Sequence, residues 1–293
     1  MSGTLVLAGG GKMGGALLSG WLNKGMAGAD ITVVEPDSKT ASAIRGKHGV
    51  AVVEAVGDLD ADLKPETVVF AVKPQSMDDV APAYGGYAGP DTVFLSIAAG
   101  RTIAYFEDKL GPEAAIVRAM PNTPAAVGRG ITVAAANGQV TNEQKSRCDG
   151  LLRAVGDVAW IDDEGLMDAV TAVSGSGPAY VFLLAECLAE AGREAGLPAE
   201  LSDRLARATV AGAGELLHQS GDSATRLREN VVSPGGTTAA ALEVLMGGDG
   251  WQALMTKAVA AAVKRSRELG HELINGGDCD ACYFVHWLGV RRD

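Results

Sequence analysis

Short apolar runs, separated by segments rich in glycine and proline, fill the first half of the chain. They predict strands at residues 5–8, 31–34, 67–72, 92–97, 115–119 and 130–135. Helical spacing of apolar residues follows the first run, at Leu17, Leu18 and Trp21. Strands that are apolar along their whole length, with helices between them, are typical of a parallel sheet covered on both faces. We therefore predict a doubly wound α/β domain over residues 1–162.

The pattern changes near residue 163. From there to about Gly270 we find no convincing strand, and Ala- and Leu-rich stretches with helical spacing replace the short runs. They predict helices over about 178–195 and 198–219, from about 237, and over about 251–269. Many small residues on helices favour close helix–helix contact, as in a bundle or a shared dimer core. We therefore predict an all-helical domain over residues 163–270.

Composition and charge narrow the class of protein. Hydrophobic residues make up 47% of the chain and charged residues 21%, which excludes wholesale disorder. The net charge of −11 disfavours a nucleic-acid or anionic-membrane binder. No apolar run approaches the roughly 20 residues that a membrane span needs. Four cysteines in 293 residues make no disulfide framework, so we expect a reducing, cytoplasmic location.

A glycine-rich segment directly follows the first predicted strand. Gly9-Gly10-Gly11-Lys12-Met13-Gly14 fits the pattern G-x-G-x-x-G, and a helical pattern begins there. In this context Gly9 permits a tight turn, Gly11 lets the backbone approach a pyrophosphate, and Gly14 permits close helix–strand packing. The helix N-terminus adds N–H donors and partial positive charge. The segment predicts a dinucleotide-binding Rossmann domain; an ordinary glycine-rich turn is the alternative.

An acidic residue, Glu35, ends the second predicted strand. At this position a carboxylate can accept hydrogen bonds from both ribose hydroxyls of NAD and would repel a 2′-phosphate. A solvated strand-end carboxylate is the alternative interpretation. Lys39 and Arg45 are close enough in sequence to offset the charge. We therefore expect NADH or NADPH as cofactor, with NADH favoured.

Three later strand exits also carry candidate residues, because the carboxyl ends of strands line the ligand crevice of an open α/β sheet. They are Ala71-Val72-Lys73-Pro74-Gln75, Ser96-Ile97-Ala98-Ala99-Gly100 and Met120-Pro121-Asn122-Thr123-Pro124. Lys73 can contact a ribose or a phosphate, although a lone strand-end lysine is usually solvated. Asn122 can orient a carboxamide or a ribose.

Two segments of the helical half combine small polar residues with glycine and proline. Thr171–Tyr180 includes Ser174, Ser176 and Pro178, which predict a capped helix start. Ser233-Pro234-Gly235-Gly236-Thr237-Thr238 precedes another helix and leaves backbone N–H groups free beside hydroxyls. That arrangement suits a small carboxylate. For either segment alone, structural capping is the simpler interpretation.

Together these motifs give the chain a distinctive order. It resembles the pyrroline-5-carboxylate reductases, which reduce a cyclic imine to proline, over about residues 4–270. The resemblance includes the glycine motif and the segments 71–75, 120–124, 171–180 and 232–238. It implies a Rossmann domain followed by a helical domain that interlocks with that of a second subunit, and dimers that often assemble further.

The resemblance also implies roles for individual residues. Thr171 matches the proposed hydrogen-bonding partner of the substrate's ring nitrogen. An Asn that contacts the adenosine side in many members is replaced here by Asp58, which puts that contact in doubt. The pyrophosphate is assigned to Ala8, Gly9, Gly10, Gly11, Lys12 and Met13, and the nicotinamide end to Ala71, Val72, Lys73, Pro74, Ile97, Ala98 and Ala99. The substrate carboxylate is assigned to Ser233, Gly236, Thr237 and Thr238, partly from the partner subunit.

The chemistry expected of such an enzyme needs little from side chains. A protonated cyclic imine is already electrophilic, so the protein contributes proximity and orientation while the cofactor supplies hydride. A β-hydroxyacid dehydrogenase or another imine reductase of similar two-domain design is the nearest rival. The hydroxyacid enzymes place a catalytic lysine on the interdomain helix, and no Lys occurs here between Lys145 and Lys257. A regulatory dinucleotide-binding protein without catalysis is a second rival, and it would not need the segment 233–238.

The segment 271–293 departs from the resemblance. Cys279 and Cys282, with His271 and His286, could in principle ligate zinc. One cysteine pair with loosely spaced histidines is a weak signal, so we interpret the segment as an atypical extension and predict no metal. We expect a chain without residues 271–293 to keep its reductase activity.

Overall fold

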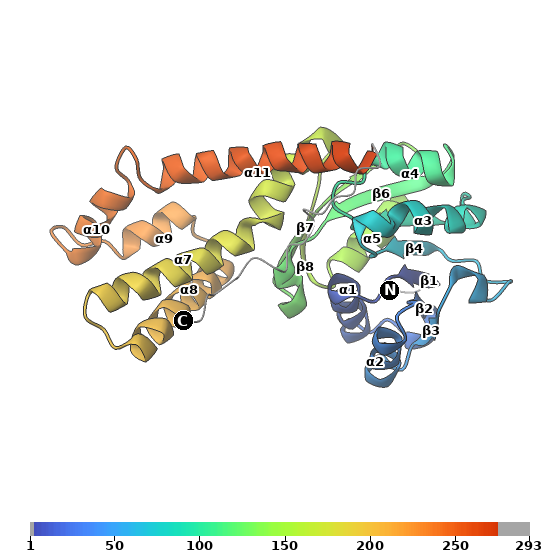
Figure 1. The fold of residues 1–293 in the computed structure, drawn as a ribbon, viewed down its shortest axis with the longest axis horizontal. Helices are drawn as coiled ribbons and strands as arrows, with labels where there is room; N and C mark the ends of the chain where they lie inside the picture. Colours follow the sequence, from blue (N-terminus) through green and yellow to red (C-terminus); the bar gives the residue numbers. More distant parts are fainter. Residues whose placement is uncertain (1–2, 275–293) are drawn as a thin grey trace. The chain divides into compact units, whose positions relative to one another are not determined.

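The structure, a computed structural model, describes residues 3–274. It divides into two compact units, one formed by residues up to Gly175 together with those from Val263, the other by Ser176–Ala262. Figure 1 shows the strands in the first unit and helices alone in the second. The tail motif Cys279–Cys282 and His286 lies outside the described residues. The predicted domains meet at residues 162 and 163, whereas the compact units meet after Gly175 and again before Val263. The predicted domain ranges therefore remain predictions.

The strands of the first unit form one sheet with the order β3-β2-β1-β4-β5-β6-β7-β8. All neighbours are parallel except β6 and β7, which pair antiparallel. The predicted doubly wound sheet is thereby confirmed, with one reversed connection. The strands are β1 (Leu5–Ala8), β2 (Ile31–Val34), β3 (Ala51–Val53), β4 (Thr67–Phe70), β5 (Val93–Ser96), β6 (Ala115–Met120), β7 (Gly130–Ala136) and β8 (Gly156–Trp160).

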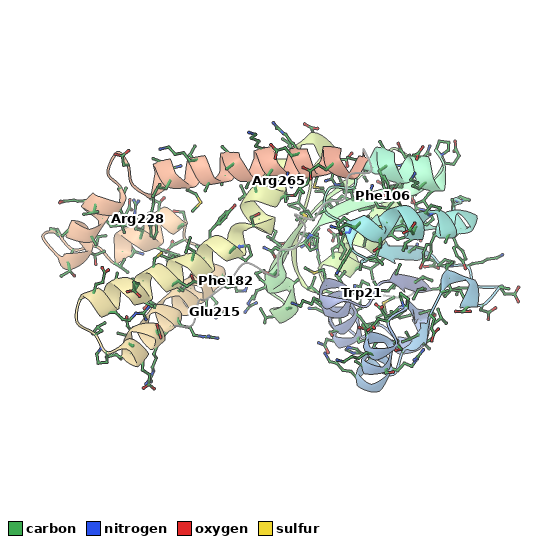
Figure 2. The ribbon with its side chains drawn as sticks, viewed as in Figure 1. Trp21, Phe106, Phe182, Glu215, Arg228 and Arg265 are labelled. Carbon is green, nitrogen blue, oxygen red and sulfur yellow. The ribbon has the colours of Figure 1, made fainter. Side chains whose placement is uncertain are left out.

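Helices cover both faces of this sheet, as its apolar strands require. On one face, Trp21 of α1 packs in a buried cluster with residues of α2 and α5. On the other, Phe106 of α4 packs in a second cluster with α3 and α6 (Figure 2). These helices are α1 (Lys12–Asn23), α2 (Ser38–His48), α3 (Met77–Val80), α4 (Ile103–Leu110), α5 (Asn142–Leu152) and α6 (Met167–Val170).

Short 3-10 helices connect the elements, and one π-helical turn, η7, follows α6. The 3-10 helices are η1 (Gly28–Asp30), η2 (Val56–Asp58), η3 (Pro74–Ser76), η4 (Ala81–Tyr87), η5 (Thr123–Val127) and η6 (Glu164–Leu166); η7 is Thr171–Gly175. Beyond residue 163 the described chain contains no strand, as predicted. Its remaining helices are α7 (Gly177–Glu194), α8 (Ala199–Gln219), α9 (Ala224–Asn230), α10 (Thr237–Leu245) and α11 (Trp251–Ile274).

Several predicted details need correction. β3, β8 and α9 were not predicted, because β3 is three residues long, β8 has only three apolar residues after Gly156 and Asp157, and α9 is short and polar. β4 stops at Phe70, two residues before the predicted end, since the chain turns there toward η3. Ser176 occupies the N-cap position of α7 and Pro178 lies in its first turn, as predicted, but among the described residues neither Ser174 nor Ser176 makes a side-chain capping hydrogen bond. The helical path continues through η7 into α7.

The expectation about long apolar segments also needs correction. The helical segment Glu164–Glu194 is long and apolar enough to cross a membrane by length and composition alone, although only 11% of its most apolar window is buried. The sequence interpretation looked for continuous apolar runs and missed it, because scattered polar residues interrupt this one. One such helix is weak evidence for a membrane span. Phe182 of α7 is among its exposed apolar side chains (Figure 2).

Candidate functional site

The candidate residues of the first unit gather at one edge of the sheet. β1, β2, β4, β5 and β6 run in parallel, so all of them end at this edge. The register pairs Ala8 with Val34 and Phe70, and pairs Ser96 with both Phe70 and Arg118. The strand order reverses between β1 and β4, which creates the crevice where ligands bind to open α/β sheets. The glycine loop stands directly at this crevice.

The conformation of the glycine loop requires glycine at two positions, because a Cβ there would collide with neighbouring atoms. Gly9 has φ +97°, and a Cβ there would lie 2.9 Å from Val72 Cγ1 in the loop after β4. A Cβ on Gly14 would lie 2.2 Å from Gly9 O, so α1 could not begin so close to β1. Gly11, in contrast, would have nothing within 4 Å of its Cβ. That open side and the unpaired first-turn N–H groups of α1 fit a dinucleotide pyrophosphate.

Glu35 is buried against the glycine loop. Its Oε2 accepts a hydrogen bond from Gly10 N at 2.7 Å, and its Oε1 accepts one from Asp37 N at 3.0 Å. The alternative of a freely solvated carboxylate is therefore wrong, since the residue is only 8% exposed. The side chain thereby fixes the conformation of the loop at the end of β2. Arg45, expected to offset the charge of Glu35, instead donates to Val52 O at 2.7 Å.

A positively charged groove of about 1,070 Å³ begins beside the glycine loop. Gly10, Gly11 and Lys12 form one end, and the lining contains no carboxylate. Its other basic side chains are Lys24, Lys39, Lys47 and His48. Burial and the neighbouring Lys47 lower the pKa of His48, so lysines supply the charge near neutral pH. In a chain with a net charge of −11, this groove is a local exception.

The loops after β4 and β5 are tied together by Arg101, which sequence reasoning missed. This buried side chain donates to Pro74 O from Nε at 3.1 Å and from Nη2 at 3.0 Å. It also pairs with Asp78 and lies 4.3 Å from the ring centroid of Tyr105. Its position after Ala99-Gly100 was the only sequence signal. Lys73 is exposed in the segment that Arg101 holds, and Ala98 is buried.

Asn122 links three segments through its amide. Its Oδ1 accepts a hydrogen bond from Ile131 N of β7 at 3.0 Å, and its Nδ2 donates to Ser174 O of η7 at 3.3 Å. The side chain thus has two structural partners, and the contact to the cofactor that the sequence suggested stays a prediction. A Cβ on Gly175 would lie 2.7 Å from Met120 Cε, so this glycine lets η7 lie against the end of β6.

The π-helical turn η7 carries Thr171 and Ser174. Thr171 Oγ1 donates to Met167 O at 2.8 Å, which leaves the oxygen lone pairs as acceptors. Ser174 Oγ is buried and has no hydrogen-bond partner among the described residues. π turns inside helices are frequent at functional sites, and an unsatisfied buried hydroxyl is costly unless something binds it. Asn122 therefore connects the cofactor edge to a turn with two available hydroxyl oxygens.

The segment Ser233–Thr238 lies in the other compact unit. Gly236 N donates to Ser233 O at 3.0 Å, and Gly235 adopts φ +71° in this turn. The turn leads into α10, which has Gly236 as its N-cap without any side-chain cap. The first-turn N–H groups at Thr237 and Thr238 consequently keep no intrahelical acceptor. Among the described residues, no cluster of His, Cys, Asp or Glu is arranged to hold a metal ion.

A Rossmann-type sheet, a glycine loop at its switch point and a separate helical unit define a dinucleotide-binding oxidoreductase. Residues 4–100 match the family described as "NADP oxidoreductase coenzyme F420-dependent". Residues 164–269 match "Pyrroline-5-carboxylate reductase dimerisation". The second match covers the helical region.

Similarity to known proteins extends along both halves. Pyrroline-5-carboxylate reductases of Pseudomonas aeruginosa and Synechocystis are 39% and 41% identical, each over 92% of this chain and 97% and 99% of their own. The solved reductase of Coxiella burnetii has a TM-score of 0.85 at 35% identity, covering 92% of this chain and 99% of its own. The chain belongs to the pyrroline-5-carboxylate reductase family.

A Plasmodium falciparum member of the family was solved with NADP bound. It is 31% identical, has a TM-score of 0.76, and covers 92% of this chain and 98% of its own. A prephenate dehydrogenase of Aquifex aeolicus, 14% identical with a TM-score of 0.53, shares the fold alone. The expected resemblance is thus confirmed, and NAD(P)H is the cofactor class.

We predict that Asn122→Ala lowers the free energy of unfolding by roughly 1–3 kcal/mol, because it leaves Ile131 N–H and Ser174 C=O without their partner. Chemical denaturation of the two proteins measures the difference. Thr123→Ala, at an exposed neighbour in the same loop, is the control and should change little. Equal stability of Asn122→Ala and the parent chain would show that the amide link is unimportant.

Proposed function

We propose that the protein reduces 1-pyrroline-5-carboxylate to L-proline with hydride from NADPH or NADH. The observation that carries this proposal is similarity to pyrroline-5-carboxylate reductases over 92% of the chain, across the glycine loop and the helical unit alike. Proline formation from this imine is the last step of proline biosynthesis. A rival hydroxyacid dehydrogenase lacks support, because the helical segments contain no lysine between Lys145 and Lys257.

The edge residues of the first unit hold the cofactor in this proposal. The N–H groups of Gly11, Lys12 and Met13 receive the pyrophosphate, because the loop is open there and α1 begins there. Gly9 and Gly14 permit the approach, and Gly10 is fixed by Glu35. The nicotinamide end lies against the loops after β4 and β5. The residues assigned to it are Ala71, Val72, Lys73, Pro74, Ile97, Ala98 and Ala99.

Two opposite charges govern the choice between NADH and NADPH. Glu35 favours the ribose hydroxyls of NADH, and its charge opposes a 2′-phosphate. Lys12 and Lys39, which line the neighbouring groove, attract that phosphate. We infer that both cofactors are used and that Glu35 sets their ratio. Asn122 acts by positioning, because its amide already bonds Ile131 and Ser174.

Substrate recognition needs an acceptor for the ring nitrogen and donors for the carboxylate. Thr171 supplies the acceptor, since its own hydroxyl proton is donated to Met167 O. A protonated imine N–H can therefore bind the remaining lone pair. Ser233, Gly236, Thr237 and Thr238 supply hydroxyl and backbone N–H donors at the start of α10. The bound cofactor supplies hydride, and the protein orients the imine carbon toward it.

A homodimer with interlocked helical units completes the proposal. Residues 164–269 match a dimerisation family, and the described helices of this region expose many large apolar side chains. Contiguous exposed apolar surface marks an interface with another protein surface. In the dimer, one subunit contributes Ser233–Thr238 to the substrate site of its partner. The exposed apolar residues include Phe182, Leu183, Leu205, Leu216, Leu217, Val244, Trp251 and Leu254. We place this enzyme in the cytoplasm, where Cys148 and Cys187 stay reduced.

The experiment that tests the function follows oxidation of NADPH and of NADH, separately, in the presence of pyrroline-5-carboxylate. We expect turnover with both cofactors and proline as product. A hydroxyacid with oxidised cofactor serves as the control for the rival dehydrogenase. Absence of turnover with the imine and either cofactor would overturn the proposal.

We predict that Glu35→Ser raises the ratio of kcat/KM for NADPH to that for NADH by roughly tenfold, about 1.4 kcal/mol, because it removes the opposing charge. Both KM values should also rise, since Gly10 N–H loses its acceptor. Steady-state kinetics with each cofactor measure the ratio. Glu54→Gln, an exposed carboxylate just beyond β3, is the matched control. An unchanged ratio in Glu35→Ser would remove the assigned role.

We predict that Thr238→Ala raises the KM for pyrroline-5-carboxylate by about tenfold and changes kcat little, because a hydrogen bond to a charged group contributes roughly 1.5–3 kcal/mol. The KM for the cofactor should stay the same. Thr225→Ala, exposed on α9, is the control for loss of a threonine in this unit. If Thr238→Ala keeps the parent KM, the carboxylate binds elsewhere.

A further inference from the structure

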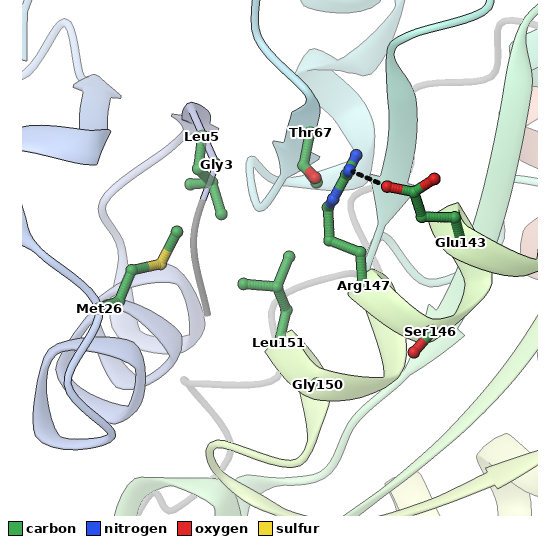
Figure 3. A pocket seen from close by; sticks show the side chains of 9 residues that line it. All are labelled: Gly3, Leu5, Met26, Thr67, Glu143, Ser146, Arg147, Gly150 and Leu151. Carbon is green, nitrogen blue, oxygen red and sulfur yellow. Dashed lines mark hydrogen bonds and ion pairs between the residues drawn. The ribbon is translucent and has the colours of Figure 1, made fainter.

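A second pocket lies at the edge of the sheet opposite to the cofactor site. It has a volume of about 440 Å³ and is lined by the starts of β1 and β4, by Met26 after α1 and by α5 (Figure 3). Glu143, Ser146, Arg147, Gly150 and Leu151 of α5 contribute, at the spacing of one helical face. Ser146 and Gly150 are small, so the space beside α5 stays unfilled. The volume is at the lower end of the range for small-molecule sites.

The pocket contains a buried hydroxyl without a partner. Thr67, the first residue of β4, is 1% exposed, and its Oγ1 makes no hydrogen bond among the described residues. The neighbouring Thr92 has a similar environment, yet its Oγ1 donates to Pro65 O at 2.6 Å. Leaving a buried hydroxyl unpaired costs about 1–3 kcal/mol. In Figure 3 the Thr67 hydroxyl is on the side of the Arg147 guanidinium.

Charges of both signs stand at the rim. The Arg147 guanidinium is 3.3 Å from Glu66 Oε2 and 3.4 Å from Glu143 Oε1. Arg147 Nη1 also donates to Glu66 O at 3.4 Å. All three distances exceed the 2.7–2.9 Å of strong charge-assisted hydrogen bonds, so these contacts of the guanidinium are long. Both carboxylates are more exposed than the arginine. Beneath them, Leu5 and Leu151 form an apolar floor.

We propose that this pocket binds a small α-amino acid with an aliphatic side chain. Its carboxylate accepts hydrogen bonds from Arg147 and from the Thr67 hydroxyl. Its ammonium group lies between Glu66 and Glu143, which a simple anion could not tolerate as well. Its side chain covers Leu5, Met26 and Leu151. A zwitterion matches both charges, the orphan hydroxyl and the apolar floor together, whereas a nucleotide is too large and too negative for the pocket.

Calorimetric titration of the full chain, saturated with NADPH, tests this site. The probes are glycine, L-valine, L-leucine and L-methionine, with 4-methylpentanoate and 3-methylbutylamine as forms of leucine that lack one charge. We expect saturable binding of L-leucine or L-methionine with a Kd near or below about 1 mM. The Kd of each singly charged analogue should be higher than that of L-leucine by roughly tenfold or more. Saturable binding by none of the four amino acids would overturn the proposal.

Variants separate this pocket from the substrate site. Thr67→Val keeps the shape and removes the orphan hydroxyl, so the protein should fold at least as stably and bind the probe roughly tenfold more weakly. Arg147→Met should abolish binding. Asn142→Ala, exposed on α5 outside the pocket, and Thr238→Ala, in the proposed substrate site, should bind like the parent chain. Unchanged binding in Thr67→Val and Arg147→Met, or lost binding in Thr238→Ala, would refute the site whatever the reductase assay shows.

Discussion

The cofactor-binding edge of the first unit depends on close approach of three backbone segments: the end of β1, the start of α1 and the loop after β4. α1 begins directly at the end of β1 because Gly14 has no side chain to collide with Gly9 O. Gly9 in turn lies against Val72 of the next strand exit. A single added methyl group at either glycine would push the helix or the loop away. The N–H donors at the helix N-terminus would then no longer be directed at a pyrophosphate. The binding edge therefore requires glycine at positions 9 and 14.

Buried side chains then fix the conformation of the loops that follow the strands at this edge. Glu35 holds the glycine loop, Arg101 holds the carbonyl of Pro74, and Asn122 holds the π turn. Each is buried and bonds to backbone atoms of a segment distant in sequence. Arg118 adds an ion pair with Glu164 at 2.7 Å, and Glu164 also accepts from Ile103 N. The edge is thus pre-organised, which suits a reaction whose main requirement is orientation.

Periodicity and glycine placement were sufficient to predict six of the eight strands, the covered faces of the sheet and the glycine loop. They work because continuous apolar strands and a G-x-G-x-x-G turn follow from local geometry. Asn122 shows the limit, since its two hydrogen bonds reach residues 9 and 52 positions away that no local pattern indicates. Arg101 is similar, because a buried arginine in a polar loop looks solvated in a sequence. The start of α7 after Ser176 follows from local pattern, whereas the π turn over Thr171–Gly175 was not predicted.

The boundary between the units has a consequence for how the protein is made. Residues 263–274, the end of α11, belong to the first unit, where Ser266 Oγ donates to Asp168 Oδ1 at 2.6 Å and Arg267 lies 3.6 Å from the same carboxylate. The helical unit is therefore an insertion into the nucleotide-binding unit. During synthesis on the ribosome, the sheet emerges first but its closing helix emerges last. The nucleotide-binding unit reaches its complete form only after the whole helical unit has been translated.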